Sequence, residues 1–301
     1  MLDKALITIK LKLVFLPFLG LSLLTAVAYA IVRWIFAIHL DIWPLKNTIG
    51  DLIIPTILSV MVVLIGMRKR VRLLRFKLFE EKSFNVCCFV MILSLFPALS
   101  VSQAYLSKAS YHVIDINSVD EVRQYPKQKY FRIANFDINK PVAEAHMTTE
   151  LSGKYQSHIL AYLYVATPFV NAENIWLAKK FRIEIDNDIT EAAKSRQLNR
   201  FLEESEREYK VFDAESIDYF EYIKNSDVKR GYLQAIKLLP QPHESEAYML
   251  LGKQGTLAED ANAELLKFIR FFLIGMAICL AMILRAEVDK KVLKNMKKKS
   301  Y

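Results

Sequence analysis

Two histidines and one glutamate of this sequence, His146, His158 and Glu150, are of the residue types that bind metal ions in proteins. They lie within residues 142–166, where apolar and polar residues alternate and predict a β-hairpin. In the expected pairing the two imidazoles are diagonal neighbours on one face, close to the carboxylate, so that together they could hold one metal ion. A metal-dependent envelope hydrolase is therefore one functional hypothesis.

The expected register of this hairpin follows from its turn. A short turn containing Gly153 would join Val142–Leu151 to Tyr155–Ala166 and place Leu151 opposite Tyr155. One face of the pair is then apolar, and the other collects the histidines, glutamates and threonines. A half-buried antiparallel sheet also presents such a polar face to solvent without binding a metal, and we favour this plainer interpretation.

A basic segment, residues 68–82, interleaves positive and apolar side chains. Its basic residues include Arg68, Lys69, Arg70, Arg72, Arg75 and Lys77. Along the inner leaflet of a membrane, each would attract anionic headgroups by about 1 kcal/mol. Lipid sensing or partner docking are the functional interpretations; a topology signal combined with an interfacial helix is the plainer one.

The common enzyme motifs are absent from the sequence. It contains no G-x-S-x-G, H-E-x-x-H, P-loop or G-x-G-x-x-G pattern. We therefore predict no catalytic residues and no cofactor, and expect a protein that is not an enzyme.

Four apolar stretches are long enough to be transmembrane helices. The chain has 301 residues, of which 53% are hydrophobic. Residues 13–32 and 84–106 carry no charge, residues 49–67 contain only Asp51, and residues 268–284 contain Arg270 near their start. About 20 apolar residues cross a hydrocarbon core of about 30 Å. Three such stretches with a single charge among them, within 106 residues, leave no amphipathic shell, which disfavours buried core helices.

Polar residues within these spans are few. We interpret Asp51 as an interfacial or helix N-terminal charge at the edge of the second span. Interhelical hydrogen bonding is the expected role of the weakly polar residues Ser94, Ser100, Ser102 and Gln103. No Asp, Glu, Lys or His lies near the middle of a span, where ion-coupled transporters normally need one.

The positive charge indicates an orientation in the membrane. The net charge is +9, but the N-terminus, the loop 68–83 and the C-terminal tail together hold 17 basic and five acidic residues. The loop 33–48 and the segment 107–267 lack this excess. The positive-inside rule then places both termini in the cytoplasm and 107–267 outside. A nucleic-acid-binding protein would carry the excess on its folded domain, so we expect no nucleic acid.

The segment 107–267 has the pattern of an α+β domain. We predict strands at Tyr111–Ile116, Tyr130–Ile138, Val142–Leu151, Tyr155–Ala166, Ile175–Ile185 and Ala247–Leu251. It contains no cysteine, since Cys87, Cys88 and Cys279 lie in the spans. A domain without disulfides fits a bacterial envelope better than a eukaryotic secreted protein.

Helical patterns occupy the second half of this domain. One helix would be capped by Asp188, a second would follow Asp213, and a third would be capped by Ser226 and end before Pro240. Finally, Thr256 would open a continuous helix that runs into the fourth span and couples the domain to it rigidly.

The predicted fold is an α-helical membrane protein with four transmembrane helices and an inserted extracytoplasmic α+β domain. Its parts are residues 1–106, with three spans, the domain 107–267, and residues 268–301, with the fourth span and a basic tail. We expect a multi-pass protein of the bacterial inner membrane, in contact with anionic lipids. Its expected role is that of a sensing or assembly subunit that binds a protein partner, a second copy or an envelope ligand. An oligomeric transport or channel component remains the first alternative.

Overall fold

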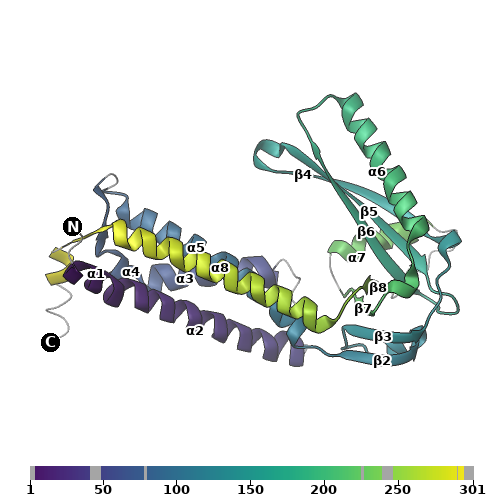
Figure 1. The fold of residues 1–301 in the computed structure, drawn as a ribbon, viewed down its shortest axis with the longest axis horizontal. Helices are drawn as coiled ribbons and strands as arrows, with labels where there is room; N and C mark the ends of the chain where they lie inside the picture. Colours follow the sequence, from purple (N-terminus) through teal and green to yellow (C-terminus); the bar gives the residue numbers. More distant parts are fainter. Residues whose placement is uncertain are drawn as a thin grey trace. The chain divides into compact units, whose positions relative to one another are not determined.

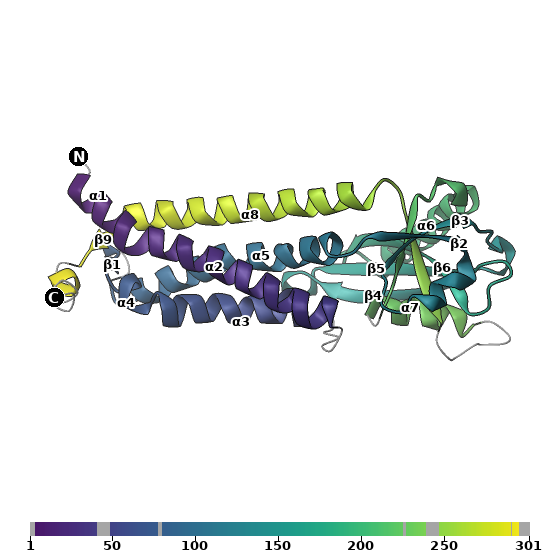
Figure 2. The ribbon, with the colours of Figure 1, turned by 90° about the horizontal axis from the view of Figure 1, so that it is seen from below.

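The computed structural model of this chain describes the residues 4–40, 49–77, 80–224, 227–238, 247–289 and 291–294. They form two compact units (Figures 1 and 2). The helical unit comprises residues 1–110 and 258–301, and the sheet unit is Tyr111–Leu257. The helical unit is thus built from two separate stretches of the chain.

Four helices in the described part of the chain are long and apolar enough to cross a membrane. They are Ala5–Phe36, Ile49–Gly66, Ser83–Ala109 and Leu257–Arg285. The prediction of four such helices is confirmed. The fourth is longer than the predicted stretch from Phe268, because it begins directly after Thr256 and continues without a break, as the sequence suggested.

The first of these helices consists of α1 (Lys4–Lys10) and α2 (Leu16–Arg33), joined by a π-helical stretch, Leu11–Phe15. The second contains α3 (Ile54–Met61). The third and fourth are α5 (Ser83–Ala109) and α8 (Leu257–Arg285). Figures 1 and 2 show α2, α3, α5 and α8 running alongside one another.

Buried side chains from all four helices form one apolar core. Phe18 of α2, Val63 of the second helix, Leu95 of α5 and Cys279 of α8 belong to this core and are fully buried. The opposite faces of the same helices expose large apolar side chains such as Leu24. Helices that are apolar all round need an apolar surrounding on their outer face.

Gly275 allows α8 to pack very closely on α5. A Cβ atom at this position would collide with the main-chain carbonyl of Ser94. Small residues permit such backbone approach in helix pairs of membrane proteins.

A two-stranded ribbon joins distant parts of the chain at one end of the helical unit. After α4 (Arg68–Val71), β1 (Leu74–Arg75) pairs antiparallel with β9 (Glu287–Val288). At the same end, Lys10 Nζ donates a hydrogen bond of 2.8 Å to the carbonyl of Leu284 in the last turn of α8. A cation at this position also compensates the negative end of the helix dipole.

The described residues of the sheet unit form a seven-stranded mixed sheet. Its strands are β2 (Val113–Ser118), β3 (Tyr130–Asn135), β4 (Glu144–Ser152), β5 (His158–Pro168), β6 (Ile175–Asp186), β7 (Tyr219–Tyr222) and β8 (Tyr248–Lys253). They lie in the order β2-β3-β7-β8-β6-β5-β4, with parallel pairing only for β2–β3 and β6–β8. β2 and β4 are the edges, and the predicted strands are all present with shifted ends.

A helix packs on each face of this sheet. On one face, α6 (Glu191–Val211) places Phe201 against Leu163 of β5. On the other face, Tyr232 of α7 (Asp227–Ile236) packs against Tyr164 of β5, with ring centroids 5.2 Å apart. Both cores include buried residues of β5 and β6, and the core under α7 also includes Met249 of β8.

Two of the predicted helix starts differ from the structure. The helix predicted after Asp213 is a single 3₁₀ turn followed by β7, whose Phe220 is buried in the sheet core. The run of aromatic residues favours a strand. Apolar residues at every third position over so short a run do not distinguish a helix from a strand. α6 begins at Glu191, because Thr190 rather than Asp188 accepts the capping hydrogen bond. The predicted cap Ser226 and stop Pro240 of α7 lie outside the described residues.

Candidate functional site

The β4–β5 hairpin has a different register from the predicted one. Leu151 lies opposite Ile159 rather than Tyr155. The turn is longer than expected, because Gly153, Tyr155 and Gln156 all adopt positive φ angles before β5 begins. The pairing partner of each β4 residue is four residues farther along β5 than predicted, so each side chain keeps its face but changes its neighbour.

The predicted metal ligands lie apart in this register. His146 is opposite Tyr164, and His158 is opposite Ser152, six residues farther along β4. At about 3.3 Å per residue these positions are about 20 Å apart, and Glu150 lies between them. In the described parts of the chain, no group of three His, Cys, Asp or Glu residues could hold a metal ion. The structure thus does not bring these three residues together.

The hairpin face that carries His146 is partly covered rather than open to solvent. The ammonium group of Lys180 lies 3.9 Å from the ring centroid of Tyr162 and 5.0 Å from that of Tyr164. Burial lowers the pKa of Lys180, and the nearby charge of Glu150 opposes this shift. His146 is half-buried on the same face. The lysine–aromatic contacts therefore stabilise the packing of this face.

The basic segment forms a short helix and a short strand instead of one interfacial helix. Most of its predicted headgroup ligands are exposed: Arg68, Lys69, Arg72, Arg75 and Lys77. Arg70 is half-buried and donates a hydrogen bond of 3.0 Å to the carbonyl of Leu13, and Lys77 lies 3.2 Å from Glu287. Arg75 is also paired, with its Nη2 2.8 Å from Glu80 Oε2. Contact of the exposed cations with anionic lipid headgroups stays a prediction.

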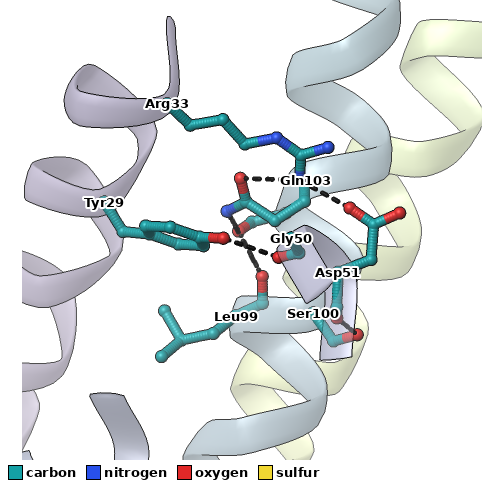
Figure 3. A network of polar contacts seen from close by, with 8 residues as sticks. Tyr29, Arg33, Gly50, Asp51, Leu99, Ser100 and Gln103 are labelled. Atoms are coloured by element: carbon teal, nitrogen blue, oxygen red, sulfur yellow. Dashed lines mark hydrogen bonds and ion pairs between the residues drawn. The ribbon is translucent and has the colours of Figure 1, made fainter. Parts of the chain in front are cut away.

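A polar network inside the helical unit links the first three spans. Arg33 Nη1 lies 2.5 Å from Asp51 Oδ1 and 3.3 Å from Gln103 Oε1 (Figure 3). The Arg33 side chain is 11% exposed, that of Asp51 is 40% exposed, and Gln103 is fully buried. The three residues come from the first, second and third helices, so the guanidinium group links all three.

Further hydrogen bonds hold the start of the second helix in this network. The hydroxyl of Tyr29 donates to the carbonyl of Gly50 at 2.5 Å, and the hydroxyl of Ser100 donates to the carbonyl of Asp51 (Figure 3). A Cβ at Gly50 would lie 3.3 Å from Arg33 Cζ, so glycine leaves room for the guanidinium group. We call these five side chains and the Gly50 backbone the Arg33 network.

The Arg33 network was only partly visible in the sequence. Of the four residues expected to form hydrogen bonds between helices, Ser100 and Gln103 do so, whereas Ser94 and Ser102 donate to carbonyls within α5. Asp51 lies in the first turn of its helix, as expected, and its ion pair with Arg33 was not predicted. The sequence feature that indicates this ion pair is one positive residue, Arg33, at the end of the first span and one negative residue, Asp51, at the start of the second. Charged pairs inside a helical bundle often have a functional role.

The second notable surface is the edge strand β4. Its side chains on the α6 face include Ala145 and Thr149, which are exposed, and Met147 and Leu151, which are 37% and 55% exposed. Tyr155, in the turn beyond it, is 89% exposed. The predicted apolar face of the hairpin is thus the more exposed one along β4, because α6 covers β5 and β6 rather than the edge.

An apolar pocket adjoins this edge. It has a volume of about 410 Å³ and lies between α6 and the sheet, lined by Ala143, Ala145, Leu163, Val165 and Tyr209. The small side chains of the two alanines leave this space open on the β4 side. Burial raises the pKa of Tyr209, while its hydrogen bond with Thr167 opposes the shift. Three charged side chains, Lys140, Glu206 and Lys210, also line the pocket, whose surface is otherwise mostly apolar.

No protein-family model, curated protein or solved structure matches the chain significantly.

Proposed function

We propose that the protein is a multi-pass protein of the bacterial cytoplasmic membrane, with both termini inside and residues 107–267 outside. The basic residues of three separate segments support this orientation. Contacts of Lys10 with Leu284, of Arg70 with Leu13 and of Lys77 with Glu287 gather these segments at one end of the helical unit. A common basic end is what the positive-inside rule requires of the cytoplasmic side.

We further propose that the protein is a non-enzymatic assembly subunit whose sheet unit binds a protein partner along β4. The observation that carries this proposal is the open edge of the sheet at β4, together with the exposed side chains of Met147 and Leu151. An unpaired strand edge offers a row of backbone donors and acceptors, and a further strand from a partner satisfies them. Apolar side chains beside the edge add affinity.

The test of this function is a change of charge on the β4 edge. Met147→Asp with Leu151→Asp introduces carboxylates that would be desolvated under a partner strand. We expect the full-length wild-type protein, in nanodiscs from native membranes, to have the mass of a complex, and the double variant to have that of a monomer. Native mass spectrometry measures both.

The matched control is Val211→Asp, at the end of α6. Val211 is 77% exposed, so the substitution adds a carboxylate to another apolar surface position of the sheet unit. The mass of this variant should equal that of the wild type. A monomeric wild-type protein, or a double variant with an unchanged complex, would refute binding along β4.

The Arg33 network favours a second candidate, an oligomeric transport or channel component. Arg33, Asp51 and Gln103 place charged and amide groups between helices that are otherwise apolar. Four spans enclose little space in a monomer, so this function requires several copies. Conductance of the purified protein in planar bilayers, with an ion selectivity that Arg33→Gln changes, is the expected result. Conductance no higher than that of protein-free bilayers would exclude this candidate.

A further inference from the structure

The edge strand β4 lacks several of the devices that usually protect a strand edge, although it carries Glu144 and Glu150. Natural sheets place Lys, Pro or a bulge on such strands to prevent pairing with another chain. β4 has nine residues, Glu144–Ser152, without Lys, Arg or Pro, and it pairs with β5 without interruption. At this edge the order of the described strands ends, so one side of the β4 backbone has no neighbouring strand.

The sequence of β4 is complementary to itself in one antiparallel register. A two-fold axis through Thr148 pairs all nine residues of two copies. On the α7 face, His146 lies opposite Glu150 of the second copy, so a possible hydrogen-bond donor meets a carboxylate. An axis through Met147 would instead oppose Glu144 to Glu150, and like charges across a strand pair are destabilising.

The same register joins the exposed apolar side chains of the α6 face. Met147 is then a diagonal neighbour of Met147 and of Leu151 in the second copy, within the reach of long side chains. Four partly exposed side chains, two from each copy, form one continuous apolar row. Their contact removes apolar surface from water, which favours association.

The apolar pocket beneath α6 is also complementary to a side chain of the second copy. In this register Leu151 of the second copy lies opposite Ala145, which lines the pocket of about 410 Å³ beneath α6. The exposed leucine of one copy can enter the pocket that the small alanine leaves in the other, and the symmetry repeats this contact. From these observations we propose that β4 pairs with β4 of a second copy, with the two-fold axis at Thr148. This inference rests on the proposed binding function and names its partner.

The test is a single cysteine on the axis, in the full-length protein in native membranes. Cys87, Cys88 and Cys279, which are buried in the helical unit, are replaced by Ala. Opposed Cα atoms in an antiparallel pair are about 4.5–5.5 Å apart, within the range for a disulfide. Thr148→Cys should therefore form a disulfide-linked dimer under a mild oxidant, as read on a non-reducing gel.

Two further variants establish the register. Ser152→Cys places the two thiols eight residues apart, roughly 26 Å, and should give at least tenfold less dimer. Glu144→Cys combined with Ser152→Cys places thiols opposite each other and should restore the dimer.

The possible failures of the two proposals are distinguishable. If Thr148→Cys does not crosslink, or if Ser152→Cys crosslinks equally well, self-pairing at Thr148 is refuted. If the Met147→Asp/Leu151→Asp variant still loses its complex in that case, β4 binds a different protein and the proposed function stands. If the complex also survives the charge change, both proposals fail.

Discussion

Arg33 and Asp51 compensate each other's charge between two helices of the bundle. Either charge without its partner would destabilise the bundle. The arginine is almost completely buried, whereas the aspartate retains some contact with the surroundings. Removing one partner of a buried ion pair leaves an uncompensated charge, while exposed pairs contribute little. The energetic role of the Arg33 network thus depends on how far each group is buried.

We expect Asp51→Asn to lower the free energy of unfolding of the helical unit by about 1–2 kcal/mol, because Arg33 loses its counter-charge. The buried cysteines Cys87, Cys88 and Cys279 allow a direct measurement, since a thiol-reactive fluorophore reports their exposure on heating. The control is Glu204→Gln, which removes an exposed ion pair with Arg200 on α6 and should leave this transition unchanged. Equal transitions for Asp51→Asn and wild type would contradict a stabilising pair.

Tyr232 predicts a loss of stability at alkaline pH. Burial raises the pKa of Tyr232, with a smaller contribution from Tyr164. The folded state therefore keeps the neutral phenol when the unfolded state, with its ordinary pKa of 10.0, already ionises. The stabilising contribution is complete below about pH 10 and decreases as the pH rises above this value.

Thermal unfolding followed by near-ultraviolet circular dichroism between pH 8 and 11 measures this effect. Tyr232→Phe should reduce the decrease of the melting temperature above pH 10, because the residue no longer ionises. Tyr155→Phe is the control, since Tyr155 is 89% exposed, and it should leave the pH dependence of wild type intact. The same pH dependence in Tyr232→Phe as in wild type would assign the alkaline loss to other groups.

At the scale of the elements, contiguous apolar stretches made the four helices predictable, whereas local patterns in the sheet unit left ambiguities. Residues 217–223 contain apolar side chains every third residue, which fits a helix, yet they include β7. The decisive contact is with β3 and β8, and these strands are distant in the sequence. The hairpin register likewise depended on the positive φ angles of Tyr155 and Gln156, which their residue types do not suggest.

Substitution by alanine should affect the stability of the helical unit differently at two glycines in different helices. Gly275→Ala forces a Cβ against the main chain of Ser94, and the backbone cannot easily yield. We expect a loss of about 1–3 kcal/mol in the stability of the helical unit. Gly20→Ala meets no atom within 4 Å and should be neutral or stabilising by up to about 1 kcal/mol. Thermal unfolding followed with the thiol-reactive fluorophore compares the two variants. Similar unfolding transitions for both would contradict the close packing of α5 and α8.

At the scale of the whole molecule, the charge distribution predicts sidedness. In a background without other cysteines, Lys77→Cys and Lys154→Cys place single thiols at exposed positions in the basic segment and in the hairpin turn. A membrane-impermeant reagent should label position 154 in intact cells and position 77 only after permeabilisation. Labelling of 77 but not of 154 in intact cells would reverse the proposed orientation.

The sequence contained enough information to predict the four long apolar helices but little to predict the Arg33 network. The net charge of +9 could be divided among segments of the chain, because apolar residues are concentrated in the membrane-spanning segments and charged residues in the segments between them. The contact between Arg33, Asp51 and Gln103 depends on how three helices rotate against one another. No local pattern specifies this rotation, and it emerges only from the packing of the bundle.

The pairing of β1 with β9 has a consequence for the order in which the protein forms. The ribosome releases the N-terminal part of a chain first, yet Leu74 needs Val288 as its partner, and Lys10 needs the carbonyl of Leu284. Between these partners the whole of Tyr111–Leu257 must be synthesised. The first three helices therefore form an incomplete assembly, with the surface for α8 uncovered, until the ribosome has synthesised Leu284 and Val288.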